Sequence, residues 1–251
     1  MLKFENITVC HGNHTVFSEI DFCLRPHRLT AVLGKNGCGK STLVSCITGQ
    51  VRYTGDILLS DRPLRFMSHR ARAEQIAVLP QLLQPVPLTV YQLVSLGRNP
   101  YLDFAGRLSQ TDRIRIEEAI ALTGIEELRD KRADLLSGGE LRKAYLAMIL
   151  AQNTRIVVLD EPDAYLDMEN ETELVKILNK LKTLHKKTLM VVMHDLTRAA
   201  EISDDILIID GGKKYFYGSR EECLKTGAIE NCFNVRRTTY EKDGELFPIF
   251  Y

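Results

Sequence analysis

Apolar and polar positions alternate over the first residues of the chain. Leu2, Phe4, Ile7 and Val9 are apolar, and the residues between them are polar or charged, which predicts a strand with one buried face over 2–9. Short apolar runs of strand length recur further along. They predict strands at 16–24, 30–33, 56–59, 76–79, 155–159, 189–193, 206–209 and 214–217. Two further segments flank 242–245 and read as a tight hairpin at the end of the chain.

Residues 89–150 follow a different pattern, because their apolar side chains recur at the three- and four-residue spacing of helices. The apolar positions are Val90, Leu93, Val94 and Leu96, then Ile114, Ala119, Ile120 and Leu122. Helices are also predicted at 141–151 and 174–184. We therefore expect a single domain over 1–251, with a catalytic core at 1–82 and 154–251 and an inserted helical subdomain at 83–153. The alternative is that these helices merely cover one face of a sheet.

Composition excludes several classes of protein. Hydrophobic residues make up 45% and charged residues 26% of the 251 positions, as in an ordinary globular protein. Lys and Arg number 33, as do Asp and Glu, so net charge gives no reason to expect a nucleic-acid partner. No apolar run approaches the length of a membrane span. The 6 cysteines form no C-x-x-C pair, which is typical of a reduced, cytosolic compartment.

The strand predicted at 30–33 leads into a loop of small and basic residues. Gly34 to Thr42 fits the pattern G-x-x-x-x-G-K-[ST], and a helix is predicted directly after it. Glycine lets the backbone wrap closely around a phosphate, so that N–H groups and the helix N-terminus point at its oxygens. Lys40 adds a charge for the β- and γ-phosphates, and the Ser41 hydroxyl can ligate Mg²⁺. The predicted nucleotide-binding residues are Gly34, Asn36, Gly37, Cys38, Gly39, Lys40, Ser41 and Thr42.

Cys38 lies inside this loop. The partial charges of the backbone N–H groups and the ammonium of Lys40 favour the thiolate form of a cysteine in such a place. We therefore expect a reactive thiol that bound MgATP protects. The alternative is that Cys38 is present only because it is small.

A second pair of glycines precedes the helix predicted at 141–151. Ser137 and Glu140 have the spacing of a capping box, which any helix can carry. A cap alone does not need Gly138 and Gly139, because glycine costs about 1 kcal/mol relative to alanine in a helix. Ser137, Gly138 and Gly139 are therefore a second place where a phosphate could approach backbone N–H groups.

Two carboxylates end the apolar strand predicted at 155–159. In parallel sheets, functional groups collect at the carboxyl ends of the strands. Asp160 is placed to hold Mg²⁺, directly or through water, and Glu161 is the candidate general base for an attacking water. The alternative is a strand capped by solvated acids, which the phosphate loop upstream disfavours. His194 ends the next strand, and this position makes it a further catalytic candidate. The alternative is a structural histidine, which is the commoner role of a lone histidine at a strand end.

Taken in order, these segments resemble the nucleotide-binding subunit of ATP-binding cassette (ABC) transporters over nearly the whole chain. The order is the phosphate loop Gly34–Thr42, Gln81 after a strand, the signature Leu136–Glu140, Asp160-Glu161, and His194. The resemblance implies an α/β fold with a P-loop NTPase core, made of a RecA-like sheet and an antiparallel β part. It also implies that the helical subdomain carries the signature. The activity implied is ATP hydrolysis with Mg²⁺, coupled to transport.

The same resemblance assigns roles to single residues. It implies a head-to-tail homodimer with two ATP molecules at the interface, each facing the signature of the opposite subunit. Gln81 would sense Mg²⁺ and the membrane partner, as a catalytic residue and a metal ligand. His194 would contact the γ-phosphate, and Asp167 would lie in the loop that crosses the interface. His11 stands where an aromatic residue often stacks on adenine, and imidazole would stack more weakly.

The segment Leu96–Tyr101, with Met193–Leu196, is similar to importers of iron–siderophore complexes, haem and cobalamin. This narrower likeness implies a peripheral subunit on the cytoplasmic side of the inner membrane, bound to transmembrane permease subunits. A periplasmic or surface solute-binding protein would act with it indirectly. We expect Arg98 to be free to pair with an acid or a helix end of the permease. The alternative is a plain loop between helices with a solvated arginine.

Other functions stay open at this point. The chain could be a soluble cassette ATPase that serves iron–sulphur cluster assembly, or an importer subunit for another metal or solute. A cassette protein that acts on ribosomes or DNA normally needs two fused cassettes or long insertions. The sequence shows one cassette and no long insertion, so we expect no nucleic-acid partner.

Overall fold

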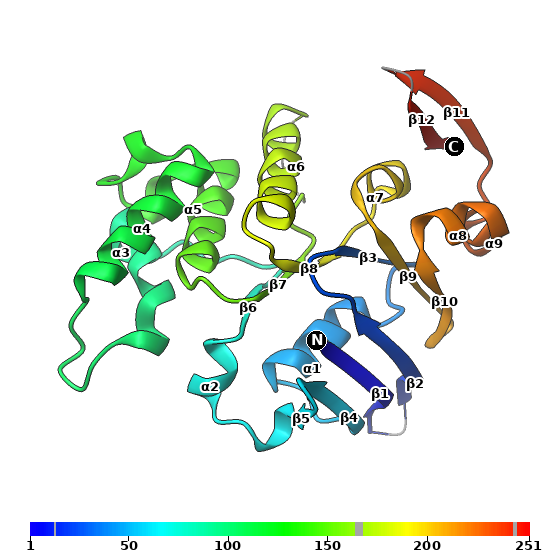
Figure 1. Ribbon diagram of the computed structural model, residues 1–251, viewed down its shortest axis with the longest axis horizontal. Helices are drawn as coiled ribbons and strands as arrows, with labels where there is room; N and C mark the ends of the chain where they lie inside the picture. Colours follow the sequence, from blue (N-terminus) through cyan, green and yellow to red (C-terminus); the bar gives the residue numbers. More distant parts are fainter. Residues whose placement is uncertain (13, 164–167, 243–244) are drawn as a thin grey trace. The chain divides into compact units, whose positions relative to one another are not determined.

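The chain divides into two compact units in the computed structural model, which describes residues 1–12, 14–163, 168–242 and 245–251. The first unit comprises Met1–Met67 and Thr188–Tyr251, and the second comprises Ser68–Lys187 (Figure 1). The predicted helical block at 83–153 lies inside the second unit. The same unit contains the strands Ile76–Leu79 and Ile156–Asp160 and the helix Met168–Thr183. The bounds of the helical block as a subdomain stay a prediction.

An antiparallel sheet in the first unit has the strand order β2-β1-β4-β5. Its strands are β1 (Leu2–His11), β2 (His14–Leu24), β4 (Thr54–Leu59) and β5 (Arg62–Pro63) (Figure 1). The predicted buried face of β1 is confirmed, because Leu2, Phe4, Ile7 and Val9 are all buried. The buried positions step by three between Phe4 and Ile7. The reason is a register shift against β2, at Asn6, whose φ is 51°.

The first unit also contains a sheet with the strand order β10-β9-β3-β8. Its strands are β3 (Leu29–Gly34), β8 (Thr188–Val192), β9 (Asp205–Asp210) and β10 (Lys213–Ser219). β3 is parallel to β8 and β9, whereas β10 is antiparallel to β9. Every residue of β3 and β8 is buried. This explains their uninterrupted apolar sequences, since strands covered on both faces do not alternate.

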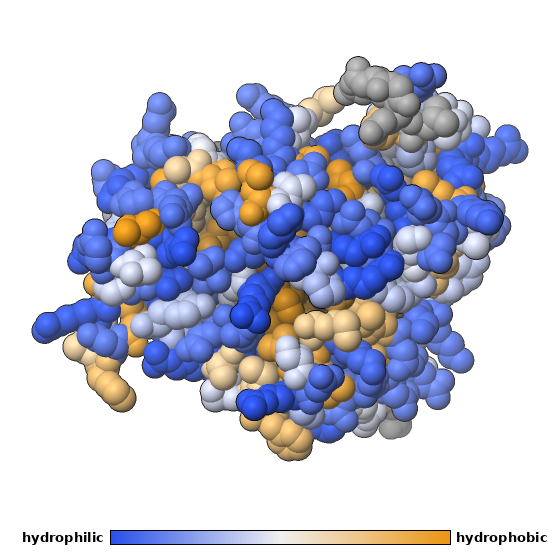
Figure 2. All heavy atoms as spheres, in the orientation of Figure 1, coloured by the Kyte–Doolittle hydropathy of each residue, from blue (hydrophilic) through white to orange (hydrophobic). Residues whose placement is uncertain are grey.

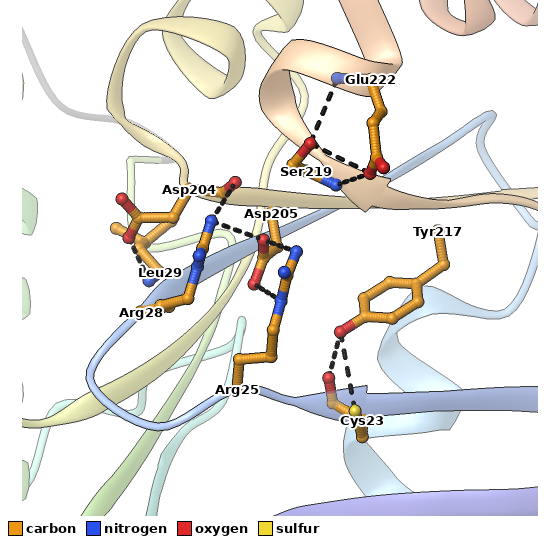
Figure 3. Close-up of polar contacts among 9 residues, drawn as sticks. All are labelled: Cys23, Arg25, Arg28, Leu29, Asp204, Asp205, Tyr217, Ser219 and Glu222. Carbon is orange, nitrogen blue, oxygen red and sulfur yellow. Dashed lines mark hydrogen bonds and ion pairs between the residues drawn. The ribbon is translucent and has the colours of Figure 1, made fainter.

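A buried carboxylate joins the ends of several strands in this unit (Figure 3). Asp205 begins β9 and is fully buried; its carboxylate accepts a hydrogen bond from Arg25 Nε at 2.9 Å and lies 3.0 Å from an Arg28 nitrogen. The Tyr217 hydroxyl of β10 donates to the Cys23 carbonyl of β2. Burial raises the pKa of Asp205, and the hydrogen bond and charges of the arginines oppose that shift. These contacts fix the turn that precedes β3.

The helices of the first unit are α1 (Lys40–Thr48), α7 (Leu196–Ile202), α8 (Arg220–Thr226) and α9 (Ala228–Phe233), with a 3₁₀ turn at Leu64–Phe66. α1 was expected from the sequence, whereas α7 to α9 were not. α8 has a recognisable signal, because Ser219 and Glu222 form a capping box and Gly227 ends the helix in the left-handed conformation. The final hairpin is confirmed by the antiparallel pairing of β11 (Arg237–Lys242) with β12 (Glu245–Phe250). Its turn residues, 243–244, lie outside the described residues.

The second unit pairs two parallel strands with a group of helices. The strands are β6 (Ile76–Leu79) and β7 (Ile156–Asp160). The helices are α2 (His69–Ala73), α3 (Val90–Ser95), α4 (Gln110–Thr123), α5 (Gly138–Ala151) and α6 (Met168–Thr183). Three 3₁₀ segments lie at Leu96–Tyr101, Glu126–Leu128 and Ala133–Leu135. Buried side chains of α3, α4 and α5 form one core, as the helical spacing predicted.

Three positions on the predicted apolar faces were wrong. Leu96 is 42% exposed and lies in the 3₁₀ segment that follows α3. Ile114 is 48% exposed, and Ile116 of the same helix is buried instead. Leu184 is 73% exposed because α6 ends at Thr183, one residue before it. No helix in the described part of the chain has the length and hydropathy of a membrane span. Figure 2 shows a face on which hydrophilic side chains predominate and hydrophobic ones form small groups.

Candidate nucleotide-binding site

The phosphate loop joins β3 to α1, as predicted. Gly34 is the last residue of β3, and a Cβ there would lie 2.4 Å from the Ile209 carbonyl oxygen. Gly39 caps the N-terminus of α1 with a φ of 101°. Both positions exclude a larger residue, the first by close approach and the second by its left-handed conformation. The loop therefore exposes backbone N–H groups at a helix start, as phosphate binding requires.

Lys40 points into this loop. Its side chain is 5% exposed, and Nζ donates to the carbonyl oxygens of Gly34 at 2.8 Å and Lys35 at 3.3 Å. The ammonium group is thus held at the centre of the loop by neutral acceptors. Phosphate oxygens can replace these acceptors, since charge-assisted hydrogen bonds are stronger than neutral ones. Ser41 follows in the first turn of α1.

The expectation of a reactive Cys38 thiolate was wrong. The thiol is buried, and this burial raises its pKa, although the charge of Lys40 acts in the opposite direction. The sulfur packs against the start of the loop, where a Cβ on Gly34 would lie 2.4 Å from it. Cys38 is therefore a small buried residue in this structure, and desolvation outweighs the local positive charge.

The first strands of the sheet pack on the phosphate loop. A Cβ on Gly39 would lie 2.7 Å from the Phe17 ring and 3.0 Å from Val16 Cγ1. The β1–β2 hairpin therefore brings its end, where His11 pairs with His14, towards the loop. His11 is exposed, and its stacking on adenine stays a prediction. The sequence did not indicate that Val16 and Phe17 support the loop at Gly39, because this contact is visible only in the packing.

Strand register brings His194 to the phosphate loop. β3 and β8 are parallel with Val32 opposite Val192, and the Met193 N–H donates to the Val32 carbonyl at 3.1 Å. His194 follows directly and is exposed. The carboxyl ends of β3 and β8 therefore place His194 beside the start of the loop. Asp167, predicted to cross the dimer interface, lies outside the described residues.

The second unit brings Gln81 and Glu161 together, although 80 positions separate them. The Gln81 side-chain amide donates to the Glu161 carboxylate. Arg142, a buried residue of α5, donates to the main-chain carbonyls of both Glu161 and Gln81, the latter at 3.2 Å. The sequence analysis missed Arg142. Through these hydrogen bonds, Arg142 links α5 to the end of β7 and to the segment after β6.

Glu161 has an unusual backbone conformation. Its φ is 50°, which is sparsely populated by residues other than glycine, and its side chain is buried. Such strain costs on the order of 1–3 kcal/mol and is found where the surrounding structure imposes it, often at functional sites. Arg142 supplies one such constraint, since it holds the Glu161 carbonyl. In this conformation, the carboxylate accepts a hydrogen bond from the Gln81 side-chain amide.

The residues present fit Mg²⁺ held mainly by a nucleotide. Within the described residues, no group of three or more His, Cys, Asp and Glu side chains could hold a metal ion by itself. Mg²⁺ commonly binds one or two carboxylates together with substrate phosphates, and not an all-protein cage. Asp160 is buried at the end of β7 and supplies one such carboxylate. That Asp160 and Ser41 together bind Mg²⁺ stays a prediction.

The signature forms the start of α5. Ser137 caps the helix in a reciprocal box with Glu140, as the spacing predicted. A Cβ on Gly138 would meet no atom within 4 Å, so the fold of the chain does not require glycine there. This observation favours an approach by a group from outside the chain.

The expectation that Arg98 is free to meet a permease was wrong. Arg98 is 6% exposed, and its Nε donates to Asp112 at 2.8 Å. Its Nη1 donates to the Ala151 carbonyl at 2.8 Å, at the C-terminus of α5. Burial opposes ionisation of Asp112, but hydrogen bonds from Ser109 and Arg98 outweigh it and lower its pKa. Arg98 is an internal connector between α4 and α5.

The fold and the loop define a nucleotide-binding ATPase cassette. The ABC transporter family matches residues 17–164, and the chain belongs to this family. It is therefore an ATP-hydrolysing protein of the cassette type.

Relatives with assigned transport roles are similar over nearly the whole chain. The petrobactin import ATP-binding protein FpuD of Bacillus anthracis is 35% identical over 93% of this chain and 86% of its own length. The ferric enterobactin transport ATP-binding protein FepC of Escherichia coli is 32% identical over 94% and 88%. An inward-facing metal-chelate type ABC transporter has a subunit with a TM-score of 0.85 at 22% identity, covering 100% of this chain and 96% of that one. This structural likeness confirms the predicted fold.

Proposed function

We propose that this chain is the ATPase subunit of an importer for iron chelates of the siderophore class. The observation that carries the proposal is the likeness to petrobactin, enterobactin and hydroxamate import ATP-binding proteins across nine-tenths of the chain. In this proposal, the chain lies on the cytoplasmic face of the inner membrane and binds permease subunits. A solute-binding protein delivers the chelate from outside.

The proposed active species is a head-to-tail homodimer with ATP at both interfaces. Lys40 and the loop amides bind the phosphates of one nucleotide, and the partner's signature closes over the γ-phosphate. The open space over Gly138 supports this arrangement. His194 adds a contact to the γ-phosphate from the end of β8. Ser41 and Asp160 would hold Mg²⁺ together with the nucleotide, and the metal would supply positive charge to the phosphates.

Glu161 acts as the general base. Its carboxylate takes a proton from the water that attacks the γ-phosphorus, and the bond to the leaving ADP oxygen breaks. Gln81 holds this carboxylate in position through its side-chain amide. Since Gln81 lies beside the exposed Leu82, a permease docked on this segment could move the base. This supports a role for Gln81 in coupling transport to hydrolysis.

The test replaces the proposed base without changing its size. Glu161→Gln should keep ATP binding while turnover falls about 10²-fold or more, as for a lost general base. With ATP and Mg²⁺, the stalled variant should elute as a dimer in size-exclusion chromatography. Glu221→Gln, an exposed acid of α8, is the matched control and should behave like the natural chain. Normal turnover of Glu161→Gln would refute the assignment.

The cargo needs a separate experiment. A deletion strain is grown under iron limitation and supplied in turn with radiolabelled ferric siderophores, haem and cobalamin. We expect uptake of a ferric siderophore to be lost and to return with the natural chain, but not with Glu161→Gln. Unchanged uptake of all three, with loss of an unrelated solute, would refute the cargo and leave the ATPase intact.

A further inference from the structure

A cavity of about 480 Å³ lies inside the second unit, away from Gln81 and Glu161 in sequence and in lining. It is bounded by α4, the C-terminal part of α5, β7 and the end of α6. Its size is within the range of about 300–1,000 Å³ that is typical of small-molecule sites. Nothing in the proposed hydrolysis uses it.

Basic side chains gather in the lining of this cavity. Arg115, Lys180, Lys187 and His185 line it, and Glu118 is the one acid among the described lining residues. Glu118 is already paired with Arg115, at 2.7 Å. The charges of Lys180 and Lys187 therefore face the cavity without a balancing acid in its lining. An anion is the ligand that this arrangement favours.

Lys187 is poorly solvated. Its Nζ donates to Asn153 Oδ1 at 2.8 Å and to the Thr154 carbonyl at 2.6 Å, which are both neutral acceptors. Burial, together with the charge of Arg115, lowers the pKa of Lys187 to about 8. A carboxylate in the cavity would supply the counter-charge that this ammonium lacks.

Another part of the lining is apolar. Leu122, Ile149 and Leu181 come from three different helices and line the same space. A fully hydrated ion such as free phosphate would leave this surface unused. An anion with a compact hydrophobic body would bury it and still reach the basic side chains.

We propose that this cavity is a binding site for a small amphipathic carboxylate, with the carboxylate at Lys187 and Lys180 and the apolar body against α4 and α5. Because the lining includes α4, α5 and β7, the ligand would contact both helices and the strand that ends at Asp160.

The probe is 2-naphthoate, measured by equilibrium dialysis against the whole chain. We expect one molecule per chain, with a Kd of about 1 mM or tighter for a ligand of this size. Lys180→Met should weaken binding about tenfold, because it removes a charged partner. Lys180 is exposed, so this variant should fold normally. Lys176→Met, on the same helix but outside the lining, is the matched control and should bind like the natural chain.

Two further arms locate the probe. The neutral 2-naphthamide should bind at least about tenfold more weakly than 2-naphthoate, and Ala121→Phe should abolish binding because it fills the cavity. Saturating ADP should leave binding unchanged. Displacement by ADP, equal binding of the amide, or an unchanged Kd in Lys180→Met would each overturn the proposal.

Discussion

Gly138 offers a substitution for which stability and activity should change in opposite directions. It is the first residue of α5, it has no positive φ, and a Cβ there meets no atom within 4 Å. Alanine should therefore fit without strain and reduce the entropy of the unfolded chain, which stabilises by about 0.4–1 kcal/mol at compatible sites. In a chain of this size, that corresponds to a rise of roughly 1–4 °C in Tm.

Turnover should nevertheless fall at least about tenfold in Gly138→Ala, because the methyl group would occupy the approach to the backbone N–H groups at the start of α5. The measurements are urea unfolding, and ATPase rate at saturating ATP. ATP-dependent dimerisation is then measured in chains that also carry Glu161→Gln. We expect the dimer to be lost when Gly138→Ala is added.

Gly97→Ala is the control for a glycine that the fold requires. A Cβ on Gly97 would lie 2.1 Å from the Met148 carbonyl oxygen of α5, and overpacking of this kind destabilises by about 1–3 kcal/mol. A Gly138→Ala chain that is less stable than the natural one would show that Gly138 is structural. A more stable chain with full turnover would show that nothing approaches α5 closely at this point.

Three further outcomes follow from burial and charge. Maleimide should label the exposed Cys10 before Cys38 at pH 7, because burial raises the pKa of the Cys38 thiol; peptide mapping that finds Cys38 labelled first would contradict this. Asp205→Asn should lower the free energy of unfolding by about 2–3 kcal/mol, less than for a fully enclosed ion pair, since Arg25 is 40% exposed and can be hydrated. A loss below about 0.5 kcal/mol in urea unfolding would mean that the network is not stabilising. Burial lowers the pKa of Lys187 from its ordinary 10.5 to about 8, so the folded chain binds fewer protons than the unfolded chain between these values, and the free energy of unfolding should rise with pH across that window. Lys187→Met should remove this rise, and an identical pH profile for both chains would count against it.

The sequence predicted the strands of the fold well, because the buried ones carry uninterrupted apolar runs. β3, β8 and β9 were all found in this way. The short helices α7 to α9 were missed, since each has seven residues or fewer and shows less than two full turns of periodicity. Leu184 was misplaced for a related reason. Apolar spacing continues past Thr183, although the helix does not.

The motifs predicted candidate residues for the chemistry, but not the local environment of each. Cys38 has the neighbours of a reactive thiol in sequence, yet its burial reverses the shift in pKa. Arg98 lies in a segment that resembles importers, yet the side chain turns inward to Asp112. The siderophore transport roles of the relatives agree with the predicted cargo. The free Arg98 that was offered in support of that cargo is instead buried and donates to Asp112. Burial depends on distant parts of the chain, which a local motif does not describe.

Arg142 shows what only the three-dimensional structure could add. Gln81, Glu161 and the signature lie in three separate segments, and their order in the chain does not show that they touch. The buried guanidinium donates to the carbonyls of Gln81 and Glu161 while its own backbone belongs to the helix that the signature begins. A charge-assisted hydrogen bond contributes about 1.5–3 kcal/mol, enough to offset the backbone strain at Glu161. Arg142 therefore links α5 directly to the peptide that carries the proposed base. In the proposed mechanism, this link would couple closure of the signature to activation of water.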